Sequence, residues 1–201
     1  LIFCSRKEEA RALSNEFNKR RNRNQHFYQT IALTGEDQED VRSKAIERLE
    51  SNDRSDQLDY IFTPVGGGGL IAGTALAAKY FSKNCKVIGG EPKNADDAFR
   101  SKQSGKIEFN DEVNTIADGL RTFLGDRNFP IILNDVERII LVEEDEIIEA
   151  MRLVWERMKI IIEPSSAVAF AALLKEKEQF KNKDVGIIIS GGNVDLTNLP
   201  F

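Results

Sequence analysis

One stretch, residues 59–76, constrains the fold more than any other part of the chain. Residues 59–65 form an apolar, partly β-branched run that contains Pro64 near its end. Four consecutive glycines follow at 66–69, and then small and aliphatic residues recur at helical spacing up to about Phe81. This order predicts a buried strand, a tight loop and the start of a helix.

The glycine loop indicates an anion site. Because Gly66, Gly67, Gly68 and Gly69 lack a Cβ, the backbone can adopt positive φ and bring several N–H groups close to a ligand. The following helix adds unpaired first-turn N–H groups and the positive end of its dipole, which suits a phosphate ester. A flexible glycine loop is the alternative from composition alone. Neither a Walker motif nor the usual dinucleotide fingerprint is present.

Composition describes an ordinary globular chain. Its 201 residues are 41% hydrophobic and 30% charged, with a net charge of −5 from intermixed charges, so neither nucleic acid nor a membrane surface is an expected partner. Cys4 and Cys85 lie in apolar runs and are predicted to be buried free thiols of a reducing compartment. No apolar run is long enough to span a bilayer, and we expect a cytoplasmic protein.

Strand-like and helix-like segments alternate along the chain. Apolar runs predict strands at 1–4, 59–65, 86–90, 137–142 and 185–189. Helical spacing predicts helices at 6–17, 37–50, 69–81, 94–104, 145–158 and 164–177, with a short helix or turn at 128–134. Because the strands are apolar on both faces, we expect an α/β fold with a mostly parallel sheet covered by helices on both faces.

Three loops that follow predicted strands, at 66–69, 91–97 and 190–193, meet at one edge of such a sheet. Together with three further segments, they occur in the order found in one enzyme family. The six segments are 65–70, 91–97, 115–119, 153–159, 163–165 and 190–195. On these residues the chain resembles the serine racemase branch of the fold-type-II pyridoxal phosphate enzymes, which are relatives of the threonine and hydroxyaspartate dehydratases.

The resemblance covers residues 59–201 well and residues 1–50 poorly. It implies that residues 1–201 form a single, cofactor-anchoring large domain that is incomplete at its N-terminus. The family holds its cofactor as a Schiff base on a lysine in a Ser-Phe-Lys-x-Arg-Gly-type motif, and the 201 residues contain no such motif. We therefore assign no catalytic residue and expect this chain alone to be inactive.

The resemblance also implies a set of contacts to pyridoxal phosphate. It places the glycine loop on the phosphate, Ser190 opposite the pyridine nitrogen, Glu163 beneath the ring region and Gly119 in a turn beside the cofactor. A hydroxyl only shares a hydrogen bond with that nitrogen, so the ring would be a weaker electron sink than with an aspartate. Without the family, Ser190 is explained by a strand-ending turn and Glu163 by a helix start.

A divalent cation site is implied next to the second of these loops. The resemblance places the ion on the side chains of Glu91 and Asp97 and on the backbone carbonyl of Ala95, with water completing the shell. Hard oxygen ligands fit magnesium, calcium or manganese and do not fit zinc. We expect the ion to have a structural role and Lys93 to point to solvent. A solvated acidic loop before a helix is the alternative.

The activity follows from the same resemblance. It implies a serine racemase that interconverts L- and D-serine and eliminates water to give pyruvate and ammonia, and that forms a homodimer when complete. Lys159 and Asn193 match positions of a nucleotide effector site, for ATP, in animal serine racemases, although Lys159 also fits a solvated helix end. The alternatives are a threonine or hydroxyaspartate dehydratase, or a non-catalytic protein that binds a phosphate ligand.

Overall fold

The computed structural model describes residues 58–82 and 84–201, which belong to one compact unit, 56–201. The strand predicted at 1–4, the helices predicted at 6–17 and 37–50, and Cys4 lie outside the described residues. The prediction of a single domain over 1–201 stays a prediction. Among the described helices, none combines the length and the apolar character that a membrane crossing requires.

The described strands form one parallel sheet. Its strands are β1 (Tyr60–Pro64), β2 (Lys86–Pro92), β3 (Val136–Val142) and β4 (Val185–Ile187), in the spatial order β3-β2-β1-β4. Phe62 in β1 pairs with Ile88 in β2 and with Ile187 in β4. The parallel sheet is confirmed, and the carboxyl ends of its strands therefore lie at the same edge.

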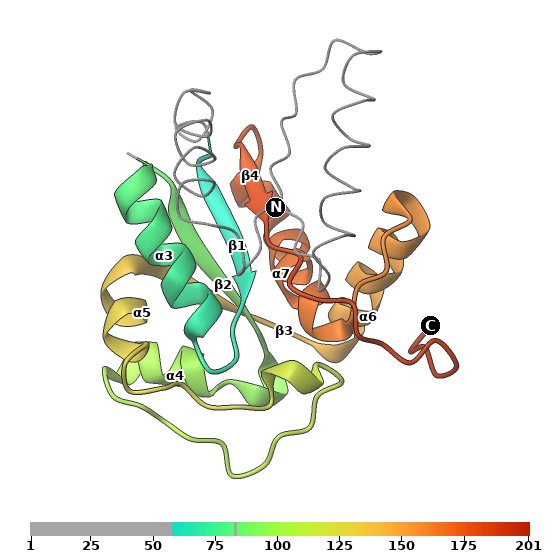
Figure 1. The fold of residues 1–201 in the computed structure, drawn as a ribbon, viewed down its shortest axis with the longest axis horizontal. Helices are drawn as coiled ribbons and strands as arrows, with labels where there is room; N and C mark the ends of the chain where they lie inside the picture. Colours follow the sequence, from blue (N-terminus) through green and yellow to red (C-terminus); the bar gives the residue numbers. More distant parts are fainter. Residues whose placement is uncertain (1–57, 83) are drawn as a thin grey trace, which may run out of the picture. The chain divides into compact units, whose positions relative to one another are not determined.

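Helices cover both faces of this sheet (Figure 1). The helices are α3 (Gly69–Phe81), α4 (Asp97–Ser104), α5 (Phe129–Asp135), α6 (Glu144–Leu153) and α7 (Pro164–Lys175). Adjacent strand residues point to opposite faces, so Ile88 packs in the cluster with α6 and α7 and Val87 in the cluster with α3 and α5. The predicted two-sided α/β architecture is confirmed.

Several predicted boundaries were wrong. The strand predicted at 86–90 continues to Pro92, so Glu91 lies in β2 and is not in a loop. The helix predicted at 94–104 starts later, at Asp97, after a 3₁₀ turn (Lys93–Ala95). The helix predicted at 145–158 changes to a π turn over Val154–Met158. Cys85 is a free thiol, as expected, but it lies before β2 and is only partly buried.

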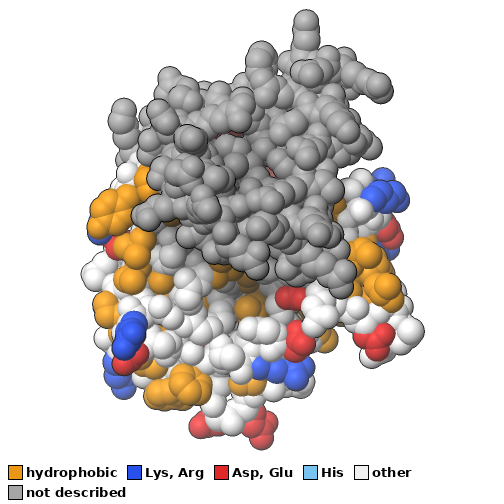
Figure 2. All heavy atoms as spheres, in the orientation of Figure 1, with side chains coloured by type: hydrophobic (Ala, Val, Ile, Leu, Met, Phe, Trp, Pro, Cys, Tyr) orange, Lys and Arg blue, Asp and Glu red, His pale blue; other side chains and the backbone are white. Residues whose placement is uncertain are grey.

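The surface carries charges of both signs. Figure 2 shows Lys and Arg side chains among Asp and Glu side chains of the described residues, with no single broad patch of either sign on this face. Several of these charges are paired, as in Lys79 with Asp135 and Lys86 with Glu137. Exposed pairs of this kind contribute little to stability, and the arrangement agrees with the intermixed charge along the sequence.

Candidate cofactor and cation sites

The glycine loop joins the carboxyl end of β1 to α3, at the lower edge of the sheet in Figure 1. Gly68 precedes the helix with φ +84°, and a Cβ there would lie 2.8 Å from Ile132 Cδ1 and 2.9 Å from Leu124 Cδ2. By contrast, a Cβ at Gly69 would meet no atom within 4 Å, and one at Gly67 would make an ordinary 3.5 Å contact. One side of the loop is therefore packed, while Gly67 and Gly69 are exposed and accessible to a ligand.

The packed side of the loop is held by hydrogen bonds. The carbonyl oxygen of Gly67 accepts from Asn128 Nδ2 at 2.8 Å and from the backbone N–H of Gly125 at 3.2 Å. In a trans peptide the C=O and the following N–H point in opposite directions. The N–H of Gly68 is therefore directed away from Asn128 and Gly125, which is the arrangement that a backbone anion site requires.

Gly119, which the resemblance assigns to a turn beside the cofactor, lies against this loop. A Cβ at Gly66 would approach Gly119 O to 3.2 Å, and the N–H of Gly119 donates to Ser165 Oγ at 3.0 Å. Ser165 is buried in the first turn of α7. Ser165 belongs to the matched segment 163–165, but the sequence did not predict that its hydroxyl accepts a hydrogen bond from Gly119. The fold thus brings Gly66, Gly119 and Ser165 together.

Glu163 and Ser190 meet at the start of α7. The N–H of Ser190 donates to Ser166 Oγ at 2.9 Å, and the N–H of Glu163 donates to Gly191 O at 3.1 Å. Glu163 Oε2 accepts from the backbone N–H of Asn193 at 2.8 Å. Glu163 is the residue before the helix but makes no side-chain capping bond to α7. Its carboxylate instead fixes the loop that carries Ser190.

The two predicted nucleotide contacts lie on neighbouring segments. Lys159 ends the π turn with φ +58° and is exposed, and Asn193 is exposed as well. A Cβ at Gly192 would lie 2.6 Å from Ile161 O, so the loop at 190–193 packs on the segment that follows Lys159. Within the described part of the chain, no hydrogen bond joins Lys159 to Asn193.

The predicted cation ligands are all buried, with exposed fractions of 2% for Glu91 and 1% for Asp97 and Ala95. The carboxylate of Glu91 accepts from the backbone N–H groups of Ala98 at 2.9 Å and Phe99 at 2.8 Å. It thereby satisfies first-turn donors of α4. Burial raises the pKa of Glu91 well above its ordinary value, and these two hydrogen bonds only partly oppose the rise.

Asp97 has one satisfied oxygen and one orphaned oxygen. Oδ1 accepts from Asn110 Nδ2 at 2.8 Å, whereas Oδ2 is buried and has no hydrogen-bond partner among the described residues. Burial raises the pKa of Asp97 to about 6. An orphaned carboxylate oxygen beside a second buried carboxylate is a donor set that a hard divalent cation would satisfy, so the residues fit the implied ion.

The rest of this ligand shell is not made of ionisable side chains. In residues 58–82 and 84–201, no group of three or more His, Cys, Asp or Glu is placed to hold a metal. A cation here therefore depends on the Ala95 carbonyl and on water in addition to the two carboxylates. Lys93 points away from the site, since its Nζ pairs with Glu143 at 2.5 Å on the surface.

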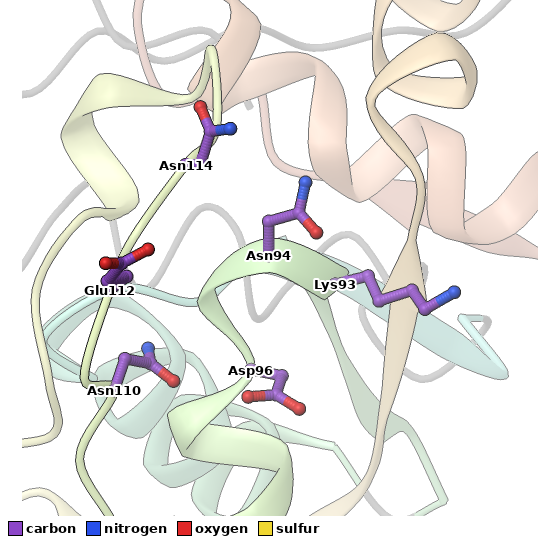
Figure 3. A pocket seen from close by; sticks show the side chains of 6 residues that line it. All are labelled: Lys93, Asn94, Asp96, Asn110, Glu112 and Asn114. Carbon is purple, nitrogen blue, oxygen red and sulfur yellow. The ribbon is translucent and has the colours of Figure 1, made fainter.

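A polar hollow of about 280 Å³ lies beside these residues (Figure 3). Charged side chains and carboxamides line it: Lys93, Asn94, Asp96, Asn110, Glu112 and Asn114. Asn110 in its wall is also the partner of Asp97. This contact was missed from the sequence, where residues 107–114 form only an irregular polar segment.

One connection contacts both candidate sites. Residues 106–128, between α4 and α5, contain one short 3₁₀ turn (Asp118–Leu120) and no strand. Asn110 in this connection bonds Asp97, Gly119 lies against Gly66, and Asn128 bonds Gly67. The connection therefore holds the glycine loop and the carboxylate pair in one framework.

Comparison with known proteins supports the resemblance inferred from the six segments. Residues 6–191 match the family described as pyridoxal-phosphate dependent enzyme. A serine racemase of Dictyostelium discoideum is 55% identical over 155 residues, which cover 75% of this chain and 48% of that protein. A beta-hydroxyaspartate dehydratase of Paracoccus denitrificans is 44% identical over 146 residues, covering 73% and 46%. The chain thus spans about half the length of the curated relatives it matches.

Solved structures agree with these relatives. A maize serine racemase superposes with a TM-score of 0.68 at 40% identity, covering 79% of this chain and 48% of that one. The crystal structure of the serine racemase from Dictyostelium discoideum gives a TM-score of 0.66 at 49% identity, covering 90% and 58%. The chain therefore belongs to the pyridoxal-phosphate dependent enzyme family, with serine racemases among its relatives.

Proposed function

We propose that this chain is the cofactor-anchoring domain of a pyridoxal-phosphate-dependent serine racemase that also eliminates water from serine. The observation that carries the proposal is the contact of the glycine loop, Gly119 and Ser165 at the carboxyl edge of the sheet. This contact fixes the packed side of the loop, so that its exposed side would be free to bind a phosphate beside the loop of Ser190, in a chain whose curated relatives include serine racemases.

Different residues of the chain would hold different parts of the cofactor. When bound, pyridoxal phosphate supplies the electron sink for proton removal at the Cα of an amino acid. The exposed side of the glycine loop and the N-terminus of α3 would hold the phosphate. Ser190 would share a hydrogen bond with the ring nitrogen without keeping it protonated. Glu163 fixes the Ser190 loop through the N–H of Asn193.

A divalent cation at Glu91, Asp97 and the Ala95 carbonyl is part of the same proposal. Its support is the buried Asp97 Oδ2, which has no hydrogen-bond partner among the described residues, together with the buried carboxylate of Glu91, whose pKa is raised by burial and further by the charge of Asp97. The ion would be magnesium, calcium or manganese, and its role would be structural, since it compensates two buried carboxylates at the start of α4. No proton transfer to the substrate is assigned to it.

The remaining functional assignments rest on the family. They are serine as substrate, ATP as an effector at Lys159 and Asn193, a homodimer of the complete protein and a cytoplasmic location. The packing of loop 190–193 on the segment after Lys159 supports a shared effector surface. The mixed charge of the chain gives no reason to expect a nucleic-acid partner.

A fusion experiment tests the activity. The segment of the Dictyostelium discoideum serine racemase that precedes the matched region would be joined to this chain, which lacks the lysine motif. With pyridoxal phosphate and L-serine, we expect D-serine by chiral chromatography and pyruvate by a coupled assay. The chain alone should give neither above the background of free cofactor, and turnover by the chain alone would contradict the assignment of roles.

The same fusion discriminates the other candidates. The 44% identity of this chain to a beta-hydroxyaspartate dehydratase makes such a dehydratase the second candidate. Ammonia release that is faster from threo-3-hydroxyaspartate or threonine than from serine would replace the racemase by a dehydratase. A fusion that binds pyridoxal phosphate and turns over none of these amino acids would support a non-catalytic phosphate-ligand-binding protein.

A further inference from the structure

We propose that Asn110 is a positioning residue for the candidate cation site: it engages Asp97 Oδ1 and thereby presents Oδ2 to the ion. This inference rests on the cation site of the proposed function and names a residue outside its ligand set. The starting observation is the asymmetry of Asp97, in which Oδ1 accepts from Asn110 Nδ2 at 2.8 Å while the buried Oδ2 has no partner among the described residues.

Arg100 fixes the orientation of the Asn110 amide. A guanidinium group has only donors, so the Asn110 atom that Arg100 Nη2 contacts at 2.5 Å must be the carbonyl oxygen, Oδ1. The NH₂ end of the same amide then faces Asp97. The identity of the donor to Asp97 is therefore set by the hydrogen-bond network.

Arg100 is itself held in place by other groups. Its Nε donates to Asp96 Oδ1, on the residue before α4, at 2.8 Å, and its Nη2 also donates to Phe109 O at 3.0 Å. Asp96, Arg100, Asn110 and Asp97 thus form a chain of hydrogen bonds. Figure 3 shows Asp96 and Asn110 along the same hollow.

The neutral amide of Asn110 separates the guanidinium group of Arg100 from the carboxylate of Asp97. A direct bond between Arg100 and Asp97 would neutralise the carboxylate and compete with a divalent cation for it. With Asn110 between them, Asp97 receives a hydrogen bond and no cationic side chain. A carboxylate also turns readily about its terminal torsion, so the fixed bond at Oδ1 keeps Oδ2 in one place. Partners of this kind affect metal affinity although they do not touch the metal.

The chain offers a matched control for Asn110. Asn114 lines the same hollow and also belongs to the connection between α4 and α5. Its amide makes no hydrogen bond with another described side chain, whereas its backbone N–H meets Asn94 O at 3.4 Å. Replacing Asn114 by leucine therefore changes the polarity of the hollow by the same amount without touching Asp97.

Calorimetric titration of the full chain with magnesium, calcium and manganese chlorides tests the inference. We expect Asn110→Leu to weaken the Kd of the parent by about tenfold or more, the range for lost outer-shell partners. Asn114→Leu should stay within about twofold of the parent, as expected for a substitution away from the site. The metal-free melting temperature, measured in parallel, separates a loss of affinity from a loss of folding.

The outcomes separate this inference from the cation site itself. A parent chain that takes up none of the three metals overturns the site and the inference together. A parent that binds, with Asn110→Leu binding equally well, overturns the inference alone. If Asn110→Leu does not fold, Arg100→Met decides, because it removes the donor that orients the amide: weaker metal binding supports the inference, and an unchanged Kd overturns it.

Discussion

The glycine loop and the carboxylate pair lie in the same compact unit but differ in the groups that they offer to a ligand. The loop offers backbone N–H groups and uses no charged side chain, and its carbonyl at Gly67 is already satisfied by Asn128 and Gly125. The pair consists of two buried carboxylates, Glu91 and Asp97, whose pKa values are both raised by burial. The hydrogen bonds that hold the loop are complete without a ligand, whereas the pair keeps one buried carboxylate oxygen, Asp97 Oδ2, without a hydrogen-bond partner among the described residues. Ligands should therefore change the stability of the two regions to different extents.

The largest expected effect is a loss of stability at the glycine loop. Gly68→Val would place a β-branched side chain at φ +84° and within 3 Å of Ile132 and Leu124. Left-handed backbone costs ~1–2 kcal/mol and overpacking a further ~1–3 kcal/mol, so we expect a destabilisation of about 3 kcal/mol. Gly69→Ala, where a Cβ meets no atom within 4 Å, should stay within about 0.5 kcal/mol of the parent. Urea denaturation measures both, and equal losses would contradict the packing described for Gly68.

The second effect concerns the carboxylate pair. Magnesium, calcium or manganese at ~100 times its Kd should stabilise the folded chain by roughly 2.7 kcal/mol. Thermal melts with and without metal, repeated after chelation, measure this shift. Glu91→Gln combined with Asp97→Asn should abolish it, because the charge that attracts the ion is removed. A shift that persists in the double variant would place the ion elsewhere.

The third effect separates binding from folding at the loop. Gly67→Val should fold, since a Cβ there makes only a 3.5 Å contact to Thr122 Oγ1, but it should obstruct the exposed side of the loop. Loss of one hydrogen bond to a charged phosphate corresponds to about tenfold weaker binding of pyridoxal phosphate. A spectroscopic titration measures the affinity. Pyridoxal, which lacks the phosphate, is the control ligand, and a similar loss for both ligands would argue against a phosphate contact.

The smallest effect is expected at Asn128. Asn128→Ala removes one of the two donors to Gly67 O and should weaken pyridoxal phosphate binding by about fivefold, equivalent to roughly 1 kcal/mol. Asn134→Ala is the matched control, because its amide bonds Pro130 O within α5 and is not part of the loop. Equal affinities for the two variants would mean that Gly125 alone is sufficient to hold the peptide.

Local pattern was enough to predict the architecture. Apolar strands and helical spacing gave the parallel sheet with helices on both faces, because burial on both sides leaves that signature in each strand. The end of β2 could not be predicted in the same way. Glu91 is tolerated inside the strand because Ala98 and Phe99 donate to its carboxylate, and such a partnership has no periodicity to detect.

From the residues alone, a candidate site was predictable only where neighbours in sequence form it, whereas Gly119, Glu163 and Ser190 were named through the family resemblance. The glycine loop is continuous, and its position before a helix already indicated an anion site. Asn110 and Asp97 are 13 positions apart, and Gly119 and Ser165 are 46 apart. Contacts over such separations depend on how α4 and α7 pack. They could therefore not be predicted from single residues in polar or turn-forming segments.

The connection of residues 106–128 has a consequence for how this protein can vary. Surface connections usually accept insertions and deletions freely, since their length is not fixed by packing. Here Asn110 and Asn128 are hydrogen-bonded to Asp97 and Gly67, and Gly119 lies against Gly66. Residues inserted between two of these anchors would have to form a bulge within that interval, because the anchors on either side keep their positions. We therefore expect the connection of residues 106–128 to tolerate changes of length less well than the exposed ends of the helices, although it has little regular structure.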